Sequence, residues 1–114
     1  MARQQVLILY RGSLLAQGIE SLLRKERGLD IASLQMRKEE SPGGFAVGVT
    51  PDVIIVDTCD LGSRARQAIL DLLEQHPKAK VVCLNPEDGR VEVYHKDQRI
   101  ATKQEELVAA IRSA

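Results

Sequence analysis

The chain has 114 residues, which suffices for one domain with a buried core but not for two. Hydrophobic residues make up 44% and charged residues 28%, as in an ordinary soluble globular domain. The 16 basic and 16 acidic residues cancel, and aromatic residues are only 3%, so no net field or base-stacking surface favours nucleic acid or an anionic membrane. We therefore expect a single domain over 1–114.

The start of the chain and its cysteines bear on localisation. The apolar run over 6–10 ends at Arg11 and is too short for a signal-peptide core or a membrane span. Cys59 and Cys83 suggest free thiols in a reducing compartment. The expected location is the cytoplasm.

The first third of the chain alternates apolar strands with an amphipathic helix. The expected elements are a strand over 6–9, a helix over 13–25 and a weaker strand over 29–35. Ser13 can cap the helix, and Gly28 can close it in a left-handed conformation. The segment 36–50 favours helix poorly, although Phe45 and Val49 could anchor one or two turns.

The stretch Pro51-Asp-Val-Ile-Ile-Val-Asp57 is the most informative part of the sequence. Its continuous β-branched run predicts a strand over 53–56 that is buried on both faces. Asp57 follows where that strand leaves the C-terminal edge of the sheet, which is the edge where open α/β sheets place their sites.

A helix over 63–75, ended by His76-Pro77, and a strand over 81–84 complete a series of βαβ units, which predicts a parallel sheet. Only the residues 85–90 then precede the next apolar alternation, whereas a parallel crossover needs about a dozen. We therefore expect 90–95 to fold back as a hairpin strand.

The remaining residues predict a second turn, a strand and a helix. The turn is expected at 96–98 and the strand at 99–101. Thr102 with Glu105 forms a capping box for a final helix that ends near Arg112. The apolar residues of that helix expected to face inward are Leu107, Val108 and Ile111.

Taken together, these elements resemble the response-regulator receiver domain, above all the receivers at the start of transcription regulators with a helix-turn-helix output domain. The resemblance is carried by the stretches 6–23, 51–57, 75–84 and 105–112. It implies a flavodoxin-like α/β three-layer sandwich. The parallel strand order would be 2-1-3-4, with a β-hairpin in place of the fourth helix.

The resemblance also assigns positions. In active receivers an aspartate after strand three accepts a phosphoryl group, two acids after strand one help hold Mg²⁺, and a Ser/Thr and a Lys contact the phosphoryl oxygens. Asp57 occupies the acceptor position, and Tyr10 and Arg11 occupy the acidic pair. Asn85 stands at the Ser/Thr position. Lys96 matches the Lys, but it lies in the altered segment.

The substitution at the acidic pair changes the local charge from −2 to +1. A guanidinium ~5 Å from Mg²⁺ is repelled by roughly 6–7 kcal/mol at an effective dielectric constant of 20. Our hypothesis is that Arg11 pairs with Asp57 instead, with Lys96 near them. Metal-dependent phosphorylation is then lost, and no metal or other cofactor is expected.

Several plainer interpretations stay open. Asp57 could be a turn or capping carboxylate, a salt-bridged relic, or a working acceptor. Arg11 could be a solvated surface residue, and Tyr10 could pack the end of the sheet. The hairpin could shorten the fold, or its edge could pair with another chain.

The expected function is that of a degenerate receiver, a non-enzymatic signalling module that contacts a protein partner and neither nucleic acid nor membrane. A homodimer through the hairpin or final helix is an open alternative. The competing functions are a phospho-accepting receiver with Asp57 as acceptor, a small enzyme, and a receiver separated from a DNA-binding domain. A zinc site is not expected, since the spacing of Cys59, Cys83, His76 and His95 does not suit one.

Overall fold

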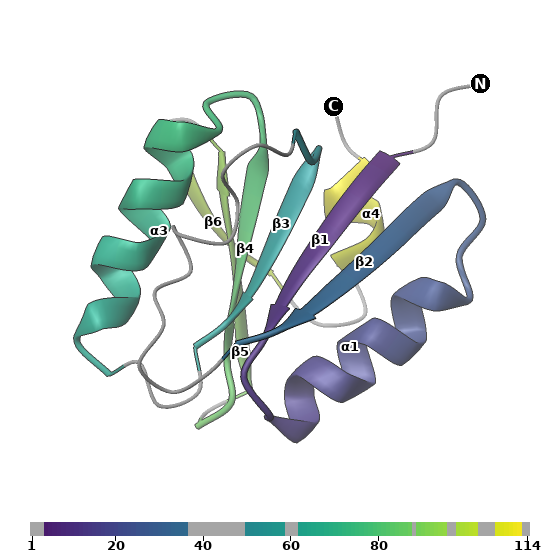
Figure 1. The fold of residues 1–114 in the computed structure, drawn as a ribbon, viewed down its shortest axis with the longest axis horizontal. Helices are drawn as coiled ribbons and strands as arrows, with labels where there is room; N and C mark the ends of the chain where they lie inside the picture. The colour runs from purple at the N-terminus through teal and green to yellow at the C-terminus, as the bar shows by residue number, and fades with distance from the viewer. Residues whose placement is uncertain are drawn as a thin grey trace.

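The computed structural model describes residues 4–36, 50–58, 62–87, 89–95, 98–102 and 107–112. The elements in chain order are β1 (Gln4–Tyr10), α1 (Leu14–Arg24), β2 (Leu29–Gln35), β3 (Val53–Asp57), α3 (Arg64–Gln75), β4 (Lys80–Asn85), β5 (Arg90–His95), β6 (Gln98–Thr102) and α4 (Leu107–Arg112). The described strands form one mixed sheet in the order β2-β1-β3-β4-β5-β6 (Figure 1). The expected α/β class and the strand order 2-1-3-4 are thus confirmed.

The parallel part of the sheet has β3 at its centre. β3 pairs in parallel with β1 on one side and with β4 on the other, so that Ile8, Ile55 and Val82 lie side by side. Every residue of β3 is buried, including its terminal Asp57. The prediction of a strand covered on both faces is confirmed, because apolar layers lie against both sides of it.

These two apolar layers hold the helices against the sheet. α1 and α4 cover one face and α3 covers the other (Figure 1). In β3, Val53 and Ile55 contribute to the layer of α1 and α4, while Ile54 and Val56 contribute to that of α3. None of the helices in the described ranges has the length and apolar character needed to cross a membrane.

The start of α1 follows the predicted signal. The Ser13 hydroxyl accepts a hydrogen bond from the amide of Ala16 at 3.1 Å, as an N-cap residue does. The C-terminal end differs from the prediction, because α1 ends at Arg24 with Lys25 as its C-cap in a right-handed conformation. Gly28 has a positive φ of 85°, but it lies beyond the helix end, where the chain turns into β2. The second predicted helix start differs slightly, since Ser63 precedes α3 without a side-chain capping bond.

The hairpin is also confirmed. β4 and β5 are antiparallel, with Asn85 opposite Arg90, and β6 continues the antiparallel ladder. Leu107 and Ile111 of α4 are buried, and Val108 packs against the same core. The expected helical turns around Phe45 and Val49 lie outside the described residues. So does Glu105 of the expected capping box.

Side chains from the sheet secure the end of α4. The carbonyl of Ile111 accepts hydrogen bonds from Gln4 Nε2 at 3.2 Å and from Lys80 Nζ at 3.5 Å. A cation suits this position because the carbonyl end of a helix carries partial negative charge. Burial lowers the pKa of Lys80. The N-terminal edge of β1 and β4 therefore fixes the last helix against the sheet.

Candidate functional site

Asp57 lies at the C-terminal edge of the sheet, and its side chain is fully buried, at 0% exposure. Its Oδ2 atom accepts hydrogen bonds from the main-chain amides of Arg11, at 2.9 Å, and Ser13, at 3.1 Å. Both donors belong to the loop between β1 and α1. The carboxylate therefore ties that loop to the end of β3, and it does so through the strong bonds that a charged acceptor makes.

Gly12 makes this arrangement sterically accessible. It lies between the two donor residues and adopts a φ of 100°. A side chain at this position would strain the backbone, because L residues rarely adopt such a conformation. The sequence Arg-Gly-Ser between a strand and a helix is the signal that could have indicated a carboxylate-binding loop.

The structure places Arg11 beside Asp57, as the sequence suggested, and the bond described above comes from its main chain. Arg11 is buried, with 9% exposure, so it is not the solvated surface residue of the plainer interpretation. The pairing of its guanidinium with Asp57 stays a prediction. The role of Asp57 as a loop-anchoring carboxylate agrees with the capping alternative.

Tyr10 packs the end of the sheet. Its ring is partly buried against the core under α1, and its hydroxyl accepts a hydrogen bond from Gln17 Nε2. These contacts agree with the packing interpretation of this residue. Its correspondence to one of the receiver acids stays a prediction.

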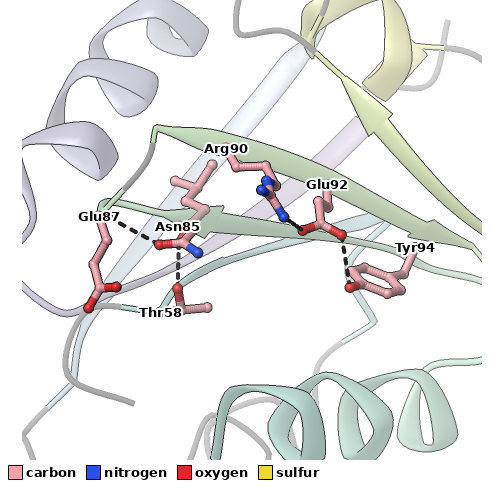
Figure 2. Close-up of polar contacts among 7 residues, drawn as sticks. Thr58, Asn85, Glu87, Arg90, Glu92 and Tyr94 are labelled. Atoms are coloured by element: carbon pink, nitrogen blue, oxygen red, sulfur yellow. Dashed lines mark hydrogen bonds and ion pairs between the residues drawn. The ribbon is translucent and has the colours of Figure 1, made fainter. Parts of the chain in front are cut away.

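Asn85 and Thr58 lie at the same edge (Figure 2). The hydroxyl of Thr58 donates to the carbonyl of Leu84 at 2.7 Å, and the amide of Thr58 reaches the same oxygen at 3.1 Å. Asn85 Oδ1 accepts from the amide of Glu87 at 3.1 Å and so shapes the turn into β5. Lys96, the remaining expected site residue, lies outside the described residues.

A groove of about 570 Å³ opens next to these residues, between the start of α3 and the strands β4 and β5. Its lining residues are Thr58, Gly62, Ala65, Cys83, Asn85, Pro86, Glu87 and Glu92. Thr58 and Glu92 were not expected at this site from the sequence. The position of Glu92 opposite Cys83 follows from the register of the antiparallel pair, which the sequence indicates only through the length of the turn.

The electrostatics of the groove are visible at Cys83. Burial, and to a smaller extent the negative charge of Glu92, raises the pKa of its thiol, whereas the hydrogen bond with Thr58 lowers it; the net result is a pKa of about 11. The thiol therefore stays protonated at neutral pH. In the part of the chain that the structure describes, no three His, Cys, Asp or Glu side chains are grouped as metal ligands.

Cys83 should consequently react slowly with iodoacetamide. Because its pKa lies about two pH units above the 9.0 of an ordinary cysteine, its thiolate fraction at pH 8 is about 100-fold lower. In a Cys59→Ser background, the alkylation rate followed by mass spectrometry should rise with pH up to about pH 11. Glu92→Gln should speed the reaction at pH 8, since it removes a negative charge. A rate that levels off near pH 9 would contradict the assignment.

No protein-family model, curated protein or solved structure matches the chain.

Proposed function

We propose that the chain is a degenerate receiver with a flavodoxin-like three-layer fold, which acts through protein contacts and does not undergo Mg²⁺-dependent phosphorylation. The observation that carries the proposal is the burial of Asp57. A phosphoryl acceptor needs a free carboxylate oxygen in line with the leaving group. Here the side chain has no exposed surface, and Oδ2 already holds two main-chain amides.

The charge of the neighbouring residues supports the same conclusion. Mg²⁺ prefers oxygen ligands and usually sits on one or two carboxylates. The two positions that would supply acids, the last residue of β1 and the one that follows it, carry Tyr10 and Arg11, and the Tyr10 hydroxyl is engaged with Gln17. A cation at this edge would therefore meet a phenol and a cationic residue instead of two carboxylates.

The proposed module works in the cytoplasm with a protein partner and without direct contact with nucleic acid or membrane. The sheet edge at β6 supports a role in association, because in the described residues β6 pairs with β5 and is the last strand on that side of the sheet. Light scattering coupled to size-exclusion chromatography would tell whether this association includes a second copy of the chain.

The decisive test is incubation with acetyl phosphate and Mg²⁺, followed by intact-mass measurement. We expect no gain of a phosphoryl group, because the Asp57 side chain is enclosed and the two positions at the end of β1 carry no acidic residue. An active receiver treated in parallel controls for the reagent. A phosphoryl group that appears on the wild type but not on Asp57→Asn would replace the proposal with the alternative, a functional phospho-accepting receiver.

A further inference from the structure

The groove beside α3 exists because of the hairpin. Asn85 and Arg90, which end β4 and begin β5, lie opposite each other, so no crossover helix is inserted between these strands. Val91 and Val93 point into the core beneath α4. The alternate residues Glu92 and Tyr94 therefore lie on the α3 side of the sheet, where both keep partial exposure.

The lining of the groove combines an apolar part with acceptors. Ala65, Cys83 and Pro86 provide the apolar surface, while the carboxylates of Glu87 and Glu92 provide negative charge. None of the described lining residues is basic. A side chain with an apolar stem and a cationic end matches this combination, and arginine has both.

Glu92 is the better placed of the two carboxylates. Its side chain is only 14% exposed, and one oxygen accepts a hydrogen bond from the Tyr94 hydroxyl at 3.2 Å. The other oxygen faces a guanidinium of the chain itself, since Arg90 Nη1 lies 3.9 Å away (Figure 2). This separation exceeds a hydrogen bond, and the Arg90 side chain is 60% exposed, so this contact is a weak one.

We propose that the groove between α3 and the β4–β5 hairpin docks an arginine side chain of a partner protein, with the guanidinium on Glu92 and the aliphatic stem along Ala65, Cys83 and Pro86. The proposal rests on the proposed function as a protein-interaction module and names the surface and the chemistry of the partner. Glu87, at the exposed rim, adds a second negative charge to attract the arginine.

The test is an NMR titration of the full ¹⁵N-labelled chain with the peptide acetyl-Ala-Arg-Ala-amide. We expect saturable shifts at the amides of Thr58, Ala65, Asn85 and Glu92. The same peptide with citrulline in place of arginine keeps the shape and removes the charge, and it should bind about tenfold more weakly. Equal binding of the two peptides, shifts located elsewhere, or no shift at millimolar peptide would each overturn the proposal.

Three variants sharpen the test. Glu92→Gln keeps an acceptor for Tyr94 and should weaken binding of the arginine peptide about three- to tenfold. Arg90→Gln removes a guanidinium of the chain itself that competes for Glu92, and it should strengthen binding of the arginine peptide. Glu74→Gln makes the same charge change at an exposed position near the other end of α3 and should leave it unchanged. If the arginine peptide does not bind and acetyl phosphate adds no phosphoryl group, the arginine site is rejected, whereas the proposed function is not.

Discussion

Replacing Asp57 with alanine should lower the free energy of unfolding by about 3 kcal/mol, because it leaves two main-chain amides without their acceptor at a buried site. The amides are those of Arg11 and Ser13. For a domain of this size the loss corresponds to a fall in melting temperature of roughly 10 °C. Calorimetry or urea denaturation monitored by circular dichroism would measure it.

Two further variants measure how much of this loss comes from the charge of Asp57 and how much from the burial of its hydrogen bonds. Asp57→Asn keeps one oxygen as acceptor and should cost about 1 kcal/mol, since it removes the charge-assisted part of the bonds. Asp52→Ala makes the same truncation at the other end of the β3 region, where Oδ2 accepts from the exposed amide of Gln5 at 2.8 Å. Water can replace that acceptor, so the expected loss is below about 1 kcal/mol.

Equal losses for Asp57→Ala and Asp52→Ala would mean that Asp57 does not brace the loop. A large loss of unfolding free energy in Asp57→Ala alone would show that the Asp57 carboxylate holds the β1–α1 loop in place. A phosphoryl group placed on Oδ2 would have to displace both amides, at the cost of the same two main-chain hydrogen bonds.

The parallel strands could be predicted because short β-branched runs such as Val53-Ile54-Ile55-Val56, bounded by turn residues, favour a strand enclosed on both faces. It was also sufficient for the hairpin. The few residues between Asn85 and Arg90 cannot cross over a sheet, and this geometric limit holds whatever their identity.

The atoms that meet at the site could not be derived in the same way. Asp57 could be placed at the edge of the sheet from the sequence, but its acceptor bonds depend on the backbone angles of the β1–α1 loop, with Gly12 at positive φ. The pairing of Cys83 with Glu92 depends on the register between β4 and β5. A shift of one residue in that register would move the side chain of Glu92 to the other face of the sheet. Local sequence patterns determine the elements, whereas these contacts arise only when elements are combined.

The largest effect expected away from the site is at Leu72, in the middle of the layer between α3 and the sheet. Leu72 is fully buried, and Leu72→Ala should lower the free energy of unfolding by about 3–5 kcal/mol through lost burial and the cavity left behind. Leu70 lies two residues earlier on the same helix and is 49% exposed. Leu70→Ala therefore serves as a matched control for helix propensity and side-chain chemistry, with an expected loss below about 1 kcal/mol.

This pair of variants also tests how α3 is oriented. Chemical denaturation of both proteins measures the two losses under the same conditions. If α3 were rotated about its axis, Leu70 would face the sheet and the order of the two losses would be reversed. The groove would then disappear as well, because Ala65 lines it only while Ile69 and Leu72 face the core. A larger loss at Leu72 is therefore a condition for the arginine site, and it can be measured without any ligand.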